Sequence, residues 1–142
     1  MTMNQNTIAQ AAQVSGAGIQ HWIGVGLTSL VVLFLIFDGV TKMVRVPQVV
    51  EACQKVGIGP DLVVPIGVLL VACTAIYVTP RTAILGAILL TAYLGGAVTV
   101  HVIARQGMFP IIFAIGFGVM VWSGLILREP RLIRWILLRQ YS

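Results

Sequence analysis

The side chains best suited to chemistry in this sequence are an acid, a base, an imidazole and a phenol set within otherwise apolar segments. Asp38 and Lys42 lie four residues apart, the spacing at which an acid and a base meet on one face of a helix. His101 lies one helical turn before Arg105, and Tyr93 precedes both in the same apolar segment. Charges in apolar surroundings are costly unless paired, so Asp38 and Lys42 are expected to neutralise each other. The pair either fixes a helix end or belongs to a polar ligand or proton site.

The composition is too apolar for a protein surrounded by water. Of the 142 residues, 58% are hydrophobic and 9% are charged, and the mean hydropathy is +1.00. Soluble domains usually carry about 25% charged residues. The values exclude a soluble enzyme, a disordered protein and a nucleic-acid-binding module, and they indicate a lipid bilayer. The net charge of +5 is then expected to reflect topology and contact with anionic headgroups.

Four long apolar segments carry the candidate residues. They cover residues 22–46, 62–78, 82–104 and 110–127. A hydrocarbon core about 30 Å thick needs roughly 20 residues at about 1.5 Å each, so each segment can cross it, the second only barely. Helix is expected because a segment in lipid must satisfy its own backbone hydrogen bonds. Short connections force antiparallel neighbours, which predicts an all-α fold: a four-helix transmembrane bundle in up-down-up-down order.

Three parts are expected along the chain. Residues 1–21 form a polar, mostly unstructured tail, residues 22–127 the four-span membrane domain, and residues 128–142 a basic amphipathic tail. Five Lys or Arg residues fall on the side of the termini and four on the other side. The concentration of arginines in the C-terminal tail favours both termini in the cytoplasm.

Two segments have the pattern of helices that lie on a membrane surface. Residues 47–60 separate polar from apolar side chains on a helical wheel, which predicts a short interfacial helix between the first two crossings. Pro47 suits its first turn and Gly57 its end. In the C-terminal tail, basic and apolar residues also take opposite sides. Its membrane-surface residues are predicted to be Arg131, Arg134, Trp135 and Arg139.

Small residues recur every four positions in the segment 82–104. Such a stripe lets helix backbones approach closely where lipid provides no hydrophobic drive. We interpret it as a packing surface within the bundle, with self-association of two chains as the alternative. The residues concerned are Ala87, Thr91, Gly95 and Thr99, with Gly96 beside them.

The ligand residues are expected to converge at one rim of the bundle. The first and third crossings run in the same direction, so His101 reaches the membrane face that holds Asp38 and Lys42. An acid, a base and an imidazole there suit the polar head of a ligand such as a quinone, while the apolar bundle receives its tail. Tyr93 and Arg105 are assigned to the same site.

No strong cofactor motif accompanies these residues. The sequence lacks the nucleotide-binding glycine motifs, the zinc-protease motif and the haem-attachment motif. Cys53 and Cys73 are expected to be unpaired thiols, and neither a metal site nor a covalently bound cofactor is expected. His21 and His101 fall on opposite faces, so they are not expected to hold a haem together. The chain is therefore not expected to catalyse electron transfer alone.

Three stretches resemble the DoxX-like group of small four-helix membrane proteins. They are FDGVTKMV at 37–44, KVGIGP at 55–60 and YLGGAVTVHVIARQG at 93–107, within a resemblance that covers residues 22–127. Some members resemble subunits of a quinol oxidase or of thiosulfate:quinone oxidoreductase, and others look like the membrane part of an oxidative-stress complex with soluble partners. The resemblance implies a bacterial inner membrane protein. The family pattern falls on Gly39, Lys42, Gly95, Gly96 and His101.

The leading hypothesis is an accessory or anchoring subunit of a quinone-linked membrane redox complex. It would contact lipid and either protein partner subunits or further copies of itself, with a quinone or another isoprenoid lipid as the expected ligand. Asp38 departs from the family pattern, in which small or apolar residues are more usual, and the arginine-rich tail is an addition. The alternatives are a stand-alone transporter or proton-conducting protein, and a homo-oligomeric structural membrane protein.

Overall fold

A computed structural model describes the backbone of residues 5–128 and the side chains of residues 18–128. Over this range the chain is all-helical, as predicted, and holds five helices. They are α1 (Gln5–Met43), α2 (Pro47–Lys55), α3 (Val63–Val78), α4 (Ala83–Ile103) and α5 (Met108–Arg128). The C-terminal surface residues Arg131, Arg134, Trp135 and Arg139 lie outside the described residues.

Three helices are long and apolar enough to cross a membrane. They are the Gly18–Met43 part of α1, α4 and α5, whereas α3 is a shorter apolar helix. Of the four predicted crossings, three are therefore helices long enough to span a membrane by themselves, and α3 is shorter. The expectation of an unstructured tail up to residue 21 was wrong for residues 5–21, because α1 runs unbroken from Gln5. That stretch has no proline to interrupt a helix.

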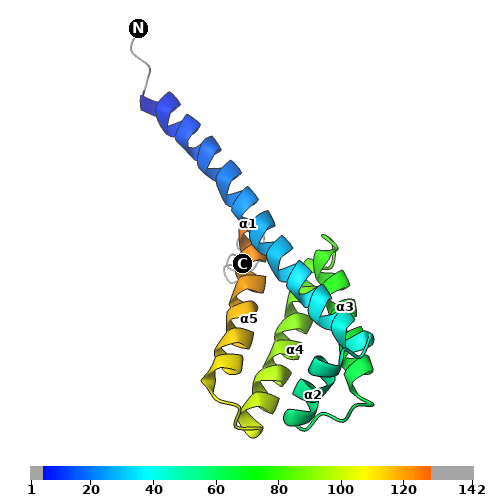
Figure 1. Cartoon of the computed structure of the whole chain (residues 1–142). Coiled ribbons are helices and arrows are strands. Elements are labelled where there is room, and N and C mark those ends of the chain that lie inside the picture. Colours follow the sequence, from blue (N-terminus) through cyan, green and yellow to red (C-terminus); the bar gives the residue numbers. More distant parts are fainter. Residues whose placement is uncertain (1–4, 129–142) are drawn as a thin grey trace, which may run out of the picture.

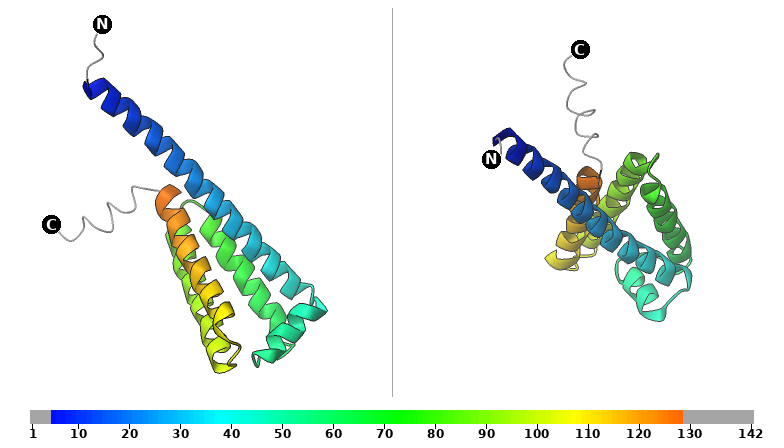
Figure 2. Two further views of the ribbon diagram at one scale, coloured as in Figure 1. Left: turned by 60° about the vertical axis from the view of Figure 1, so that its left-hand side comes forward. Right: turned by 90° about the horizontal axis from the view of Figure 1, so that it is seen from above.

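The four longer helices form a ring in which α1 and α4 each pack against both α3 and α5. Successive members of the ring run in opposite directions along the chain (Figure 1). The short helix α2 lies at the end of the bundle where α1 finishes and α3 begins, and the N-terminal part of α1 projects beyond the other helices (Figure 2).

Glycines bring α1 against α5 at the end of the bundle away from α2. A Cβ on Gly24 would lie 2.8 Å from the backbone nitrogen of Arg128, and one on Gly124 would lie 2.7 Å from Thr28 Oγ1. Distances this short require a residue without a side chain. The two backbones are therefore closest in this half.

At the α2 end, α1 instead lies closest to α3. A Cβ on Gly67 would lie 2.7 Å from the carbonyl oxygen of Gly39 and 2.9 Å from Lys42 Cβ. Because α1 contacts α5 at one end and α3 at the other, it crosses the bundle diagonally and separates from α5 toward α2 (Figure 1).

The packed core occupies the half of the bundle away from α2. Tyr77 is fully buried there, and its hydroxyl donates a hydrogen bond of 2.8 Å to the carbonyl oxygen of Val121. Gly86 allows α4 to approach the backbone of Tyr77. Other large, fully buried side chains are Val31, Leu70, Thr74, Leu90, Val121 and Leu125, and Val63 is buried at the α2 end, where α3 begins.

The predicted small-residue stripe on α4 divides into two parts. Ala87 is buried in the core, whereas Thr91, Gly95, Gly96 and Thr99 are exposed in the single chain. No atom of another element lies within 4 Å of a Cβ built on Gly95 or Gly96. The interpretation of these two glycines as helix-packing residues was therefore wrong within the bundle, because α3 and α5 do not approach α4 closely there.

Candidate ligand-binding site

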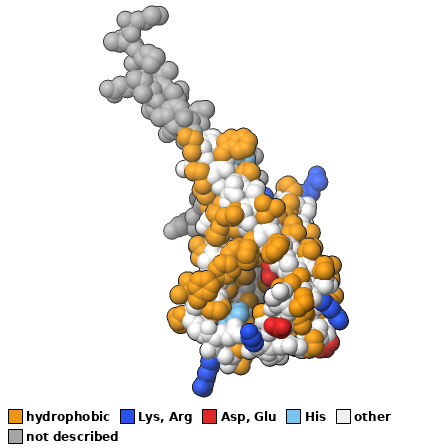
Figure 3. All heavy atoms as spheres, in the orientation of Figure 1, with side chains coloured by type: hydrophobic (Ala, Val, Ile, Leu, Met, Phe, Trp, Pro, Cys, Tyr) orange, Lys and Arg blue, Asp and Glu red, His pale blue; other side chains and the backbone are white. Residues whose placement is uncertain are grey.

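A cavity of about 720 Å³ lies in the part of the bundle next to α2. All five helices contribute to its wall, from Phe34 and Lys42 on α1 to Phe117 on α5. Figure 3 shows a hollow on this face of the molecule, with hydrophobic side chains around it and a histidine near its edge. The cavity lies where the diagonal course of α1 draws it away from α5.

The structure brings four of the five predicted ligand residues to this cavity. Asp38, Lys42, Tyr93 and His101 all line it. Arg105 is not among the lining residues and is exposed in the turn after α4. Its backbone has a φ of 52°, so it ends the helix in the left-handed region.

The Asp38 and Lys42 side chains form the predicted ion pair. Lys42 Nζ donates to Asp38 Oδ2 at 2.5 Å, and the two side chains are 12% exposed for Lys42 and 32% for Asp38. They come from one face of α1, four residues apart. The pair is therefore partly shielded from solvent, and its two charges offset each other within the cavity wall.

His101 is held by a residue that sequence reasoning did not single out. Its Nδ1 lies 3.1 Å from Gln106 Oε1, and the Gln106 backbone N–H also donates to the His101 carbonyl oxygen. An amide oxygen only accepts, so Nδ1 carries the proton in this contact. The other ring nitrogen, Nε2, has no hydrogen-bond partner among the described residues. The left-handed turn at Arg105 makes this contact feasible by reversing the chain after α4.

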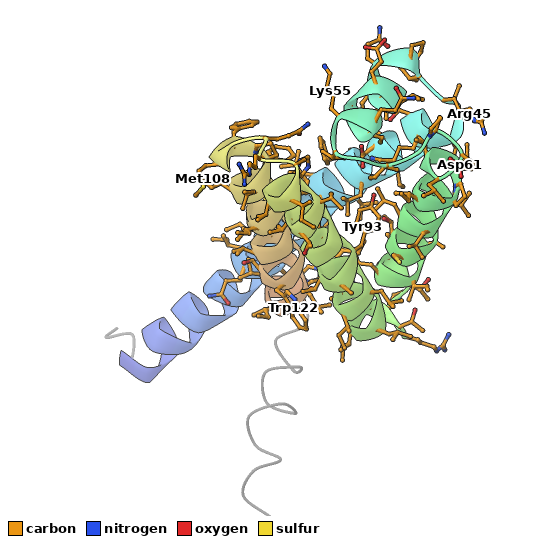
Figure 4. All side chains as sticks on the ribbon, turned by 90° about the horizontal axis from the view of Figure 1, so that it is seen from below. Arg45, Lys55, Asp61, Tyr93, Met108 and Trp122 are labelled. Carbon is orange, nitrogen blue, oxygen red and sulfur yellow. The ribbon has the colours of Figure 1, made fainter. Side chains whose placement is uncertain are left out.

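Tyr93 supplies a phenol hydroxyl from the middle of α4. It lines the cavity and is half-buried. Figure 4 shows its side chain in the space between α4 and α3, with Lys55 and Met108 toward the α2 end of the bundle. Together with His101 on α4 and the ion pair on α1, the phenol adds polar groups to the cavity wall from two helices.

Four phenylalanines, one on α1 and three on α5, form an apolar part of the cavity wall. The ring centroids of Phe34 and Phe117 are 4.4 Å apart, and those of Phe34 and Phe113 are 5.5 Å apart. Phe109 stacks on Phe113 at 6.0 Å. The sequence analysis missed these residues, although the spacing of 109, 113 and 117 places all three on one face of a helix.

Small residues on α4 give the cavity its depth. Ala92, Gly96 and Ala97 line it, and Gly96 has open space where a side chain would be. The neighbouring Gly95 lines a different feature, a shallow groove of about 450 Å³ between α4 and α5. Beside that groove Trp122 Nε1 donates to Thr91 Oγ1 at 2.9 Å. The two glycines therefore contribute to separate hollows.

The helix α2 closes the cavity at the end of the bundle. It begins with Pro47 and ends before Gly57, which has a φ of 84°, as predicted for these two residues. Cys53 is the buried residue of α2 and lines the cavity, a role the sequence did not reveal. Burial raises the pKa of its thiol above the ordinary 9.0, an effect that Lys42 opposes and Asp38 reinforces.

Comparison with known proteins identifies the family. Neither the curated proteins nor the solved structures give a match. A model of the DoxX-like family matches residues 26–124, which is well over half of the chain and includes every cavity residue described above. The chain therefore belongs to the DoxX-like family, and its apolar helices make it a small membrane protein in contact with lipid.

Proposed function

We propose that this protein binds the polar head of a lipid-soluble ligand in the α2-end cavity and serves as an accessory subunit of a quinone-linked membrane complex. The observation that carries the proposal is the presence of Asp38, Lys42, Tyr93 and His101 in the wall of one cavity whose remaining lining is largely apolar. Pockets for small molecules combine a mostly apolar lining with a few polar groups that fix orientation.

The chemistry of these polar groups suits a quinone or another isoprenoid with oxygen substituents. Lys42 Nζ and the Tyr93 hydroxyl can donate to a carbonyl oxygen, while His101 Nε2 and the free carboxylate oxygen of Asp38 can accept from a hydroxyl. A ligand that alternates between carbonyl and hydroxyl forms would therefore find a hydrogen-bond donor in the first form and an acceptor in the second. In this proposal the redox centre belongs to a protein partner.

The proposed topology has four crossings, with both termini in the cytoplasm of a bacterial inner membrane. With 16 residues, α3 spans about 24 Å. It packs between α1 and α4, both long enough to cross, so it lies within the same bilayer. The cavity and α2 then face the periplasmic side.

A transporter is disfavoured by the packing beyond the cavity. Fully buried Tyr77, Leu70 and Leu90 fill the half of the bundle between the cavity and the other membrane face. A substrate that crossed the membrane through one chain would have to displace this core. The cavity is therefore better suited to holding a ligand than to passing one through.

Ligand retention tests the proposal. The full chain is extracted into lipid nanodiscs, and binding of a decyl-tailed benzoquinone is measured for wild type and for the charge-balanced double variant Asp38→Asn/Lys42→Gln. We expect a loss of affinity of about tenfold or more, equivalent to about 1.4 kcal/mol. The matched control Trp122→Phe changes a polar contact outside the cavity and should bind like wild type. Equal affinity of wild type and the double variant would reject the site, and proteins co-purified in mild detergent would identify the complex.

A further inference from the structure

Resting on the proposed ligand site, we infer that its ligand is a single-tailed amphiphile with an uncharged head, which reaches the cavity sideways from the bilayer between α1 and α5. The argument uses the course of α1, the aromatic contacts between the two helices and the charge of the cavity wall.

The two helices separate step by step toward α2. At Gly24 and Gly124 their backbones are in direct contact. Nearer to α2, aromatic rings bridge them, since Phe34 reaches Phe117 and Phe113. Beyond this level α1 is drawn toward α3 by Gly39 and Gly67. The opening between α1 and α5 is thus widest beside the cavity.

The rings at this opening are partly or largely exposed in the single chain. Phe34 is 38% exposed, Phe113 is 43% and Phe109 is 78%. All three also line the cavity, so one set of side chains faces both the cavity and the surrounding lipid. Phenylalanine rings carry no polar group, so the passage of a hydrocarbon tail between them has no cost of desolvating one. Their rotation, rather than movement of a helix backbone, is enough to admit a tail.

The charges in the cavity wall favour a neutral head. The formal charges among its lining residues are those of Asp38 and Lys42, which form an ion pair. A phosphate or carboxylate head would add an unbalanced negative charge in largely apolar surroundings, which is costly. One tail suits the opening better than two, because the exit is bounded on both sides by phenylalanine rings. A diacyl phospholipid therefore fits neither the charge nor the shape.

A fluorescent reporter next to the cavity distinguishes this route from one past α2. Gln48 is exposed and lines the cavity, so a bimane on Gln48→Cys, with Cys53→Ala and Cys73→Ala, reports contact with a quinone probe. Association and dissociation of decyl-benzoquinone in nanodiscs are followed by stopped flow. Phe113→Ala widens the α1–α5 opening, and the matched control Val49→Ala widens the α2 side of the same cavity.

We expect Phe113→Ala to accelerate both association and dissociation by about tenfold, equivalent to about 1.4 kcal/mol of barrier, and by clearly more than Val49→Ala does. The reverse pattern would overturn the lateral route. If Phe113→Ala does not fold, Phe113→Leu should give a smaller acceleration in the same direction. Decyl phosphate should not compete, and equal competition would reject the uncharged head. No quenching in the parent reporter would reject the ligand site itself, a result distinct from unchanged rates.

Discussion

Gly39 on α1 and Gly67 on α3 lie so close that a Cβ on Gly67 would be 2.7 Å from the carbonyl oxygen of Gly39. This contact holds the C-terminal half of α1 against α3 and away from α5. The cavity occupies the space that results. The close α1–α3 contact, which requires glycine, therefore accompanies the opening between α1 and α5.

Gly67→Ala should destabilise the bundle because the added methyl group would contact backbone and side-chain atoms of α1. Forcing extra volume into a packed contact typically costs about 1–3 kcal/mol. The measurement is unfolding in mixed micelles. Gly26 on α1 is the matched control, because nothing lies within 4 Å of its Cβ position. Gly26→Ala should be neutral or stabilising, and equal losses for both variants would show that α1 and α3 are not in close contact.

The Asp38 and Lys42 ion pair predicts non-additive effects on stability. Asp38→Asn alone leaves the Lys42 ammonium without its partner in a largely shielded position. It should therefore destabilise the fold more than Asp38→Asn/Lys42→Gln. A coupling energy of about 1–2 kcal/mol is expected from a double-mutant cycle for groups in contact. Strictly additive losses would contradict the pairing.

The sequence predicted the helical segments and most of the polar residues of the cavity wall because both follow from local patterns. Apolar runs set the helices, and the four-residue spacing of Asp38 and Lys42 set their contact. The antiparallel order brought His101 to the same end. The sequence could not predict the tilt of α1, because the tilt depends on which glycines of two distant segments come into contact. The stripe containing Gly95 and Gly96 was misread for the same reason: small residues allow close packing or leave a hollow, and only the partner helix decides which.

The variant Arg105→Gly tests whether Arg105 acts only in the turn after α4 or also binds the ligand. Arg105 occupies the left-handed region at φ 52°, where a side chain costs about 1–2 kcal/mol relative to glycine. The substitution should raise the unfolding free energy by about 1 kcal/mol. It should leave quinone affinity unchanged, because Arg105 does not line the cavity. A loss of affinity as large as that of the Asp38/Lys42 double variant would show that Arg105 contributes to ligand binding.

Cys53 makes stability depend on pH in the alkaline range. Burial, the largest cause, raises the thiol pKa in the folded chain above the ordinary 9.0, so the folded state keeps its proton at a pH where the unfolded state loses it. The contribution is fully present below the ordinary pKa and is lost as pH rises through the folded pKa. Thermal unfolding in detergent should therefore show a larger drop above about pH 9 for wild type than for Cys53→Ala. Identical pH profiles would contradict the raised pKa.

The adjacent glycines of α4 provide the sharpest test of the cavity. Gly96 lines the cavity and Gly95 lines the groove between α4 and α5, and each has open space at its Cβ position. Gly96→Leu should leave the fold intact while its side chain occupies the cavity, lowering the affinity for decyl-benzoquinone by about tenfold or more, or about 1.4 kcal/mol. Gly95→Leu adds the same volume one residue away, outside the cavity, and should bind like wild type. Circular dichroism and unfolding confirm that both variants are folded before affinities are compared. If Gly95→Leu weakened binding as much as Gly96→Leu, the effect would come from the helix rather than from filling the cavity.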